Sequence, residues 1–175
     1  MGHDWGGQLA WITAARSPRR ARTLTVISRP HPAAFAHAMS EDPEQSKRSG
    51  HHRAFQRAEA TDELLANGAA PLRADVAAYL ATLGERAALD AALNWYRAAG
   101  SSGIAAADVP AVLVPTLYVW GDADATVGRR AAEGTRKLVE APYRFVELAG
   151  IGHFVTDQAP DVFPPLLLAQ LRESV

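Results

Sequence analysis

The stretch MGHDWGGQLAW, residues 1–11, has the pattern of a sharp turn that leads from a strand into a helix. Glycines at positions 2, 6 and 7 flank Asp4. Glycine lets such a turn tighten and lets the helix pack close to the strand, because it has no Cβ. Asp4 lies at the apex, where turns of this kind usually carry a nucleophilic serine. The stretch therefore predicts a nucleophilic carboxylate; the alternative is that Asp4 only caps the helix.

Strand and helix patterns alternate near both ends of the chain. Runs of β-branched and aromatic residues predict the strands, and apolar residues at helical spacing predict the helices. The predicted elements are strands over 22–28, 116–120 and 143–148 and helices over 6–16, 129–140 and 161–173. Strands that alternate with helices are typical of a parallel sheet. We therefore expect an α/β fold that contains the C-terminal strands of such a sheet.

The middle of the chain contains no convincing strand. A helix is predicted to begin at Asp42 and Pro43, and apolar stripes over 72–83 and 89–96 end at Gly84 and Gly100. We interpret this region as a helical cap over the carboxyl edge of the sheet, where parallel sheets bind ligands. The expected organisation is a first core segment, a cap and a second core segment, over residues 1–28, 29–109 and 110–175.

Three loops next to strands carry residues that could form a catalytic site. They are GHDWGG with Asp4, GDADATV with Asp124, and GIGHF with His153. Asp122 is the alternative acid in the second loop, but we expect it to cap the loop or the next helix. A lone histidine is usually structural. His153 follows a strand and a Gly-x-Gly bend, so we interpret it as catalytic.

With these loops the sequence resembles the α/β-hydrolases that use an aspartate nucleophile, namely epoxide hydrolases and haloalkane dehalogenases. The elbow G-x-D-W-G-G is present as residues 2–7, and LNWYR, residues 93–97, is similar to the lid segment of soluble epoxide hydrolases. The resemblance covers the whole chain and implies that Asp4 attacks a saturated carbon and becomes an ester. His153, oriented by Asp124, would then activate water, and the Trp5 backbone N–H would face the oxyanion.

The resemblance also implies roles for residues of the cap. Tyr96 would donate the proton that the leaving alkoxide of an epoxide needs; the alternative is that it only packs on the apolar stripe of its helix. His51 stands where the family has a second lid tyrosine. This departure from the family's pattern leaves either a single phenol donor or an imidazole in place of the second phenol. Trp95 and the leucines at 72, 80 and 89 would contact the substrate, which we expect to be a small apolar molecule.

The family's sheet has eight strands, and its elbow follows the fifth. The resemblance therefore implies that this chain is a fragment that lacks strands one to five, with at most the tip of the fifth retained. It contains no His-Gly-x-Pro motif for the second oxyanion donor. Three strands would remain, and strand 22–28 would lose a neighbour. An exposed apolar strand edge favours aggregation.

The expected function is the opening of an epoxide to a diol. A haloalkane dehalogenase is the first alternative, because the Trp5 indole could hold a halide, although a halide needs no lid phenol such as that in LNWYR. A remnant without catalytic activity is the second, and the missing oxyanion loop supports it. Asp4 in place of serine nearly excludes an ordinary serine esterase.

Composition excludes several other classes. The net charge of −1 gives no reason to expect nucleic acid or acidic lipid, and the absence of cysteine excludes disulfides and thiolate metal sites. We expect no cofactor and no metal. No apolar run is long enough to span a membrane and no signal peptide is evident, which predicts a cytoplasmic location. The basic cluster 47–57 is interpreted as a solvated face, and histidines 3, 31, 37 and 52 as loop or surface residues.

Overall fold

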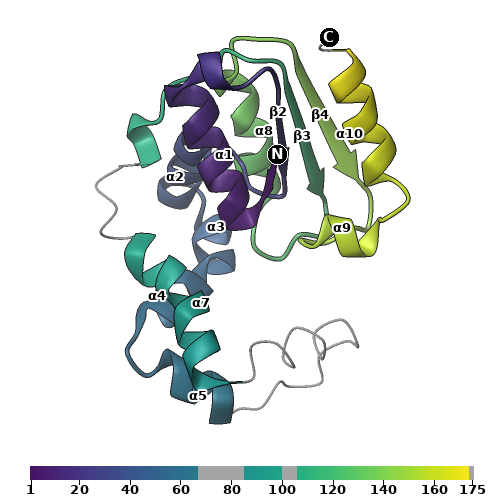
Figure 1. Ribbon diagram of the computed structural model, residues 1–175. Coiled ribbons are helices and arrows are strands. Elements are labelled where there is room, and N and C mark those ends of the chain that lie inside the picture. The colour runs from purple at the N-terminus through teal and green to yellow at the C-terminus, as the bar shows by residue number, and fades with distance from the viewer. Residues whose placement is uncertain (67–84, 100–105, 174–175) are drawn as a thin grey trace. The chain divides into compact units, whose positions relative to one another are not determined.

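The centre of the fold is one sheet of four parallel strands (Figure 1). It is seen in a computed structural model that describes residues 1–66, 85–99 and 106–173. The strands lie in the order β1-β2-β3-β4 and comprise Gly2–His3, Leu24–Ile27, Thr116–Gly121 and Tyr143–Leu148. The prediction of a parallel sheet is confirmed. The expectation that strand 22–28 loses its neighbour is wrong, because the two residues of β1 pair with Val26 and Ile27 of β2.

Helices and short 3-10 turns connect the strands. In the described ranges they are α1 (Asp4–Arg16), η1 (Pro18–Arg20), α2 (Pro32–Glu41), α3 (Pro43–Arg48), α4 (Gly50–Gln56), α5 (Ala60–Ala66), α7 (Arg86–Ala99), η2 (Ala106–Asp108), α8 (Arg129–Gly134), η3 (Thr135–Leu138), α9 (Val155–Gln158) and α10 (Phe163–Arg172). The predicted start at Asp42 and Pro43 is present, since the Asp42 carboxylate accepts a hydrogen bond from the backbone N–H of Glu44. The stripe over 72–83 lies outside the described residues.

The predicted bounds of two helices were wrong. The segment 129–140 is the short helix α8 followed by η3, because Val139 leaves the helical path and forms a parallel bridge with Val112. The last helix begins at Phe163 rather than at residue 161. Proline is tolerated in the first turn of a helix but not in its interior, so Pro164 sets the start of α10.

Helices cover both faces of the sheet and make a three-layer arrangement (Figure 1). One core lies between the sheet and α1, α2 and α8, and its largest side chains are Trp11, Phe35, Tyr118 and Trp120. The other lies between the sheet and α9 and α10, and contains Ile27, Leu117, Val119, Val155 and Phe163. Successive side chains of a strand point to opposite faces, so β2 and β3 contribute to both cores and are buried throughout. This is the pattern expected of inner strands of a parallel sheet.

The chain divides into two compact units. The first comprises Met1–Ser49 and Ile104–Val175 and contains the sheet; the second comprises Gly50–Gly103. The division at residue 50 lies later in the chain than the cap boundary expected at residue 29. The reason is that α2 packs into the first core through Phe35 and Ala38, which the sequence pattern did not indicate.

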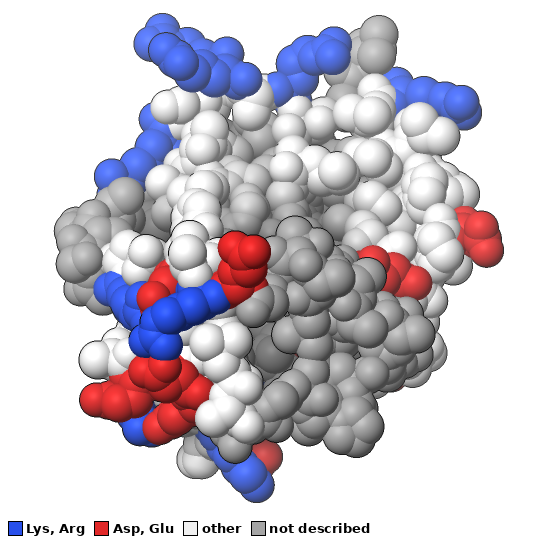
Figure 2. All heavy atoms as spheres, turned by 60° about the horizontal axis from the view of Figure 1, so that its bottom comes forward, with Lys and Arg blue, Asp and Glu red and all other residues white. Residues whose placement is uncertain are grey.

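The second unit consists of α4, α5 and α7 in its described part. Leu93 and Ala60 are buried within it, and α4 and α5 both contact α7. Ion pairs lie on its surface, Arg57 with Glu63 and Arg86 with Asp62. Basic and acidic side chains accordingly lie next to one another on the forward face in Figure 2. These exposed pairs contribute little to stability, because water screens them.

Candidate active site

The sharp turn predicted from the sequence is present between β1 and α1. Asp4 is the first residue of α1 and has a φ of 48°, in the left-handed region that few residues other than glycine adopt. The N-cap of α1 is His3, and its side chain makes no capping hydrogen bond. Asp4 is therefore not the N-cap of α1, contrary to the alternative considered from the sequence. The strained backbone instead holds the Asp4 carboxylate at the carboxyl end of the sheet.

Glycines make this turn possible by close approach. A Cβ on Gly2 would lie 2.2 Å from the carbonyl oxygen of Gly6, and a Cβ on Gly7 would lie 2.9 Å from Cγ1 of Val26. A side chain at either position would separate the strand from the helix. Gly6 itself has open space around its Cβ position. It takes part in the close approach only through its carbonyl oxygen, which faces Gly2 and which any residue would supply.

Asp124 lies in the loop after β3 and is fully buried. Its Oδ1 accepts hydrogen bonds from the backbone N–H groups of Thr126 and Val127, at 2.7 and 3.0 Å, and from the Thr126 hydroxyl at 2.8 Å. The Arg48 guanidinium donates to its main-chain carbonyl at 2.8 Å, so this end of the basic cluster 47–57 is not simply solvated. The loop thus holds the Asp124 carboxylate with its second oxygen free to face His153.

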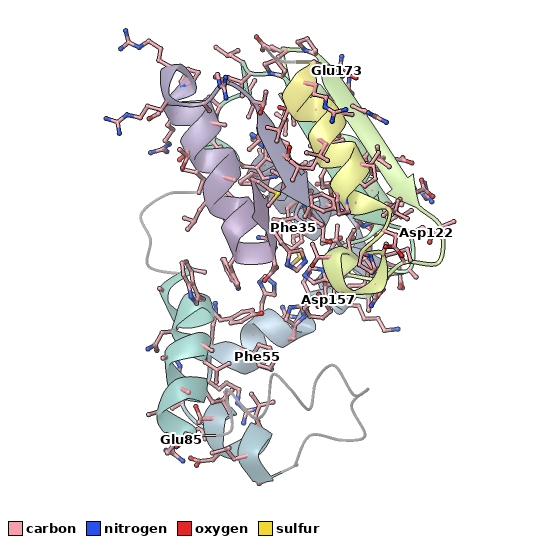
Figure 3. All side chains as sticks on the ribbon, turned by 45° about the vertical axis from the view of Figure 1, so that its right-hand side comes forward. Phe35, Phe55, Glu85, Asp122, Asp157 and Glu173 are labelled. Carbon is pink, nitrogen blue, oxygen red and sulfur yellow. The ribbon has the colours of Figure 1, made fainter. Side chains whose placement is uncertain are left out.

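Asp122, the alternative acid, has a different role. It is exposed, and Figure 3 labels its position. Its Oδ1 accepts a hydrogen bond of 2.6 Å from the backbone N–H of Gly150. Gly150 has a φ of 71°, so this bond fixes the bend before His153. The structure therefore brings Asp124, and not Asp122, to the histidine.

His153 lies between two carboxylates. Its Nδ1 donates to Oδ2 of Asp124 at 2.8 Å, and the Thr126 hydroxyl lies 2.9 Å from the same nitrogen. Its Nε2 lies 3.5 Å from Oδ1 of Asp4. Three residues from three loops, each at the carboxyl end of a different strand, thus meet as the sequence pattern predicted. When one carboxylate holds Nδ1 of an imidazole in this way, Nε2 can accept or donate a proton next to the other carboxylate.

The pKa values in this cluster follow from burial and opposite charge. Burial alone would lower the pKa of His153, but its bonds to Asp124 and Asp4 outweigh this effect and raise the pKa to about 9. Burial alone would raise the pKa of Asp4, but His153 and the charge of Arg29 lower it to about 2. The pKa of Asp124 is lowered in the same way, against burial, by His153 and Thr126. At neutral pH the cluster is therefore a protonated imidazole between two carboxylates.

Trp5 and Arg29 lie next to Asp4. The Arg29 guanidinium faces the Trp5 ring at 5.6 Å and the Phe35 ring at 4.0 Å, and it is almost completely buried. The backbone N–H of Trp5 also helps to lower the pKa of Asp4, so this group faces the carboxylate. Sequence reasoning missed Arg29, since an arginine directly after a strand has no pattern that sets it apart.

Histidines 3 and 31 were wrongly expected to be ordinary loop or surface residues. His31 is fully buried: its Nδ1 accepts from the backbone N–H of Ala33 and its Nε2 donates to the Pro110 carbonyl at 3.1 Å. Burial lowers the pKa of His31 to about 4. His3 is partly buried, and its Nε2 lies 3.0 Å from the main-chain oxygen of His153. Partners of this kind are main-chain atoms, which no pattern of side-chain types reveals.

The expected cap residues lie in the second unit, where Tyr96 and His51 are neighbours. The Tyr96 ring, on α7, packs edge-on against the rings of His51, His52 and Phe55 on α4, with centroids 6.0, 5.4 and 5.0 Å away. Tyr96 is partly buried, and Trp95 is 50% exposed. Tyr96 and His51, which the resemblance assigned to the lid, thus belong to the same aromatic cluster.

The part of the chain that the structure describes contains neither a metal-binding cluster nor a membrane-spanning helix. Over residues 1–66, 85–99 and 106–173, the acidic and histidine side chains form no group of three that could hold a metal ion. In the same ranges no helix has the length and apolar character needed to cross a membrane.

Known proteins resemble the chain both in sequence and in fold. Epoxide hydrolase 4 of Mus musculus is 28% identical over 197 residues, which cover 99% of this chain and 53% of that protein. AB hydrolase superfamily protein YfhM of Bacillus subtilis is 29% identical over 189 residues, which cover 98% of this chain and 65% of that protein. The chain thus spans about half the length of the mouse relative.

Solved structures of epoxide hydrolases superpose on this fold. One, from metagenomes of hot environments, has a TM-score of 0.80 at 24% identity and covers 97% of this chain and 66% of its own. The epoxide hydrolase of Bacillus megaterium has a TM-score of 0.77 at 21% identity, with 97% and 67% covered. The sequence also matches the family described as Alpha/beta hydrolase family over residues 1–164, which include all three loops of the site. The chain belongs to the alpha/beta hydrolase family.

Proposed function

We propose that this chain carries the catalytic residues of an epoxide-opening hydrolase in which Asp4 becomes a transient ester. The observation that carries the proposal is the position of His153 between the Asp4 and Asp124 carboxylates. A serine must lose a proton before it attacks, whereas a carboxylate such as that of Asp4 is ionised already at neutral pH, and His153 and Arg29 lower its pKa further, to about 2. A carboxylate attacks a saturated carbon, and a strained ring such as an epoxide offers one.

In the first step, an Asp4 oxygen forms a bond to a ring carbon and the ring C–O bond breaks. The electron pair goes to the ring oxygen, which takes the hydroxyl proton of Tyr96; solvent then returns a proton to Tyr96. The aromatic cluster of Tyr96 with His51 and Phe55 supports a fixed orientation for this phenol. His153 takes no part in the step.

In the second step, Nε2 of His153 takes a proton from water and the hydroxide adds to the carbonyl carbon of the Asp4 ester. The acyl C–O bond breaks, and the diol oxygen takes the proton back from His153. This base must be neutral, although His153 is protonated in the free protein. Ester formation removes the Asp4 charge and with it one of the two carboxylates that raise the His153 pKa. The first step therefore prepares the base for the second.

The substrate that we propose is a small apolar epoxide. The proposal has support from the names of the relatives, Epoxide hydrolase 4 of mouse and Epoxide hydrolase 3 of Xenopus tropicalis. The exposed Trp95 on α7 offers an apolar contact in the second unit. Dehalogenation of an alkyl halide through the same ester, and a chain with no activity of its own, are the competing outcomes.

The ester can be trapped by removing the base. His153→Gln should allow the first step and block the second, since only ester hydrolysis needs the imidazole. Mixing this variant with styrene oxide should add one substrate mass to the intact protein, on the peptide that contains Asp4. The experiment is carried out on the 175-residue chain and, separately, on the longest protein encoded by the open reading frame that contains it.

The matched controls are His37→Gln and Asp4→Asn. His37 is exposed, so its replacement should give no accumulated ester. Asp4→Asn lacks the nucleophile and should give no adduct. Absence of an adduct on His153→Gln with every epoxide that the unmodified protein hydrolyses would contradict covalent catalysis, and absence of any turnover by either protein would favour an inactive chain.

A further inference from the structure

The main-chain carbonyl of His153 is held by two side chains from the sheet. The Ser28 hydroxyl donates to it at 2.6 Å and Nε2 of His3 lies 3.0 Å from it. A carbonyl oxygen only accepts, so the His3 ring must carry its proton on Nε2 and donate. Neither residue belongs to the cluster of Asp4, Asp124 and His153, yet both act on the backbone of its histidine.

Both donors stand on rigid positions. His3 is the last residue of β1 and Ser28 directly follows β2. Ser28 is fully buried with a φ of 62°, its N–H donates to the Val119 carbonyl at 2.8 Å, and its own carbonyl accepts from the Tyr118 hydroxyl at 3.3 Å. The donors are therefore fixed by the neighbouring strands and not by the loop that they hold.

His3 also packs on the ring that it helps to orient. Its ring centroid lies 4.9 Å from that of His153 and 5.9 Å from that of Phe154. The loop has other restraints: Asp122 holds Gly150, Gln158 holds Gly152, and the backbone N–H of Val155 also donates to the His153 carbonyl, at 3.1 Å. The Val155 bond is local, within the loop itself, whereas His3 and Ser28 tie this carbonyl to the sheet. Fixing the carbonyl fixes the rotation of the His153 backbone, and with it the direction of the imidazole. A small rotation there would move Nε2 away from Asp4.

We propose that His3 is a positioning residue, which together with Ser28 holds the His153 carbonyl so that the imidazole stays between Asp4 and Asp124. The positioning role itself does not depend on the proposed function; only its expected effect on turnover does. Loss of the His3 donor slows ester hydrolysis, which uses the imidazole, and leaves the attack by Asp4 nearly unchanged. His3 does not touch the reacting atoms.

The first test needs no turnover. Three groups face the His153 imidazole: Asp4 from α1, Asp124 from the loop after β3, and His3 from β1. Its protonation is followed by NMR titration in the unmodified chain, His3→Gln, His3→Phe and His37→Gln. Glutamine keeps an N–H donor at similar reach, whereas phenylalanine keeps the ring and removes the donor.

A displaced imidazole loses its carboxylate neighbours, so the pKa of His153 should fall by about one unit or more in His3→Phe. It should stay near the original value in His3→Gln and His37→Gln. Ser28→Ala, which removes the other donor and leaves His3 in place, should lower it in the same direction, and it keeps the test valid if His3→Phe does not fold. Unchanged titration of His153 in both His3→Phe and Ser28→Ala would overturn the proposal.

The second test separates this inference from the proposed function. With styrene oxide, His3→Phe should accumulate ester to a level at least about tenfold above that in the unmodified protein, and His3→Gln should not. If the NMR shift occurs but even His153→Gln forms no ester, the positioning role stands and covalent catalysis fails. If His153→Gln forms ester while His3→Phe neither shifts the titration nor accumulates ester, the positioning role fails alone.

Discussion

The charge on the His153 imidazole depends on two carboxylates that approach it from opposite sides. Asp124 is buried and held by three hydrogen bonds, so its position is fixed. Asp4 is held instead by its own backbone, in a conformation that costs about 1–3 kcal/mol. The favourable electrostatic contact with His153 offsets part of this strain. The same arrangement should make folding stability depend on pH.

The first prediction concerns that dependence. The pKa of His153 is raised from 6.5 to about 9 on folding. The contribution of His153 to the free energy of unfolding is therefore fully present below pH 6.5 and is lost as the pH rises through 9. The free energy of unfolding should fall by up to about 3 kcal/mol over this window. Urea denaturation at a series of pH values should show the fall in the unmodified chain and a much smaller one in His153→Gln. Equal slopes would mean that the imidazole gains no proton on folding.

The second prediction concerns Tyr96 and separates the two enzymatic alternatives. Tyr96→Phe keeps the aromatic packing on α4 and removes only the hydroxyl. Epoxide opening should slow about 10- to 10³-fold, since a positioned acid contributes about 10²- to 10⁴-fold and His51 can replace it in part. Turnover of an alkyl bromide should hardly change, because a halide leaves without a proton. The rates of the unmodified protein and Tyr96→Phe are measured on an epoxide and on an alkyl bromide. An unchanged rate on the epoxide would show that Tyr96 is not the proton donor.

Which site residues could be predicted depends on what they contact. Asp4, Asp124 and His153 were predictable because each follows a parallel strand, and the carboxyl ends of such strands meet at one edge. His3 and Ser28 were not, because they bind a main-chain oxygen. A peptide carbonyl is the same in every residue, so the sequence carries no sign of it.

Close backbone approach shapes the elements around the site. Gly121 ends β3, and a Cβ there would lie 2.1 Å from the carbonyl oxygen of Ile151. The loop that carries His153 thus rests directly on the end of the strand that leads to Asp124. Since a protein interior has little room to adjust, any side chain at residue 121 must push this loop away.

The third prediction compares two glycines. Gly121→Ala should lower the free energy of unfolding by about 1–3 kcal/mol, because the added methyl group overlaps backbone atoms. Gly6 lies in helix α1, and apart from its chain neighbours and the helix's own backbone no atom lies within 4 Å of its Cβ position. Gly6→Ala should therefore raise stability by up to about 1 kcal/mol. Urea denaturation of both variants measures the difference. Equal effects would show that backbone approach at residue 121 does not limit the fold.

Element bounds were predictable where one residue sets them. Asp42 does so at the start of α3, which was predicted correctly. Pro164 limits the start of α10 in the same way, but the prediction placed that start two residues too early. The break after Gly134 was not predictable, since it depends on the pairing of Val139 with Val112, a contact between residues far apart in the chain. Local pattern cannot report such a contact.

At its β1 edge the sheet is only partly paired, because β1 is shorter than β2. In the part of the chain that the structure describes, β1 has a neighbour only in β2, and it pairs with Val26 and Ile27 but not with Leu24 and Thr25. Met1, beside this edge, is 70% exposed. A strand edge with free N–H and C=O groups can pair with another chain.

The fourth prediction follows from that edge. The 175-residue chain expressed alone should self-associate as its concentration rises, because inter-chain strand pairing at this edge competes with the native monomer. Analytical ultracentrifugation over a range of concentrations measures the association. A soluble monomer with one cooperative thermal transition would show that the two residues of β1 protect the sheet sufficiently.

The second compact unit lies within the connection between β2 and β3, which are direct neighbours in the sheet. The chain segments on either side of it close on each other inside the first unit: α2 contacts η2, and the buried His31 donates to the Pro110 carbonyl. The two ends of the insertion therefore contact each other within the first unit, so we expect the register of β2 with β3 to be kept when the inserted segment changes. Over evolution a segment attached in this way can be lengthened, shortened or exchanged among descendants while the sheet and the loops of Asp4, Asp124 and His153 keep their geometry.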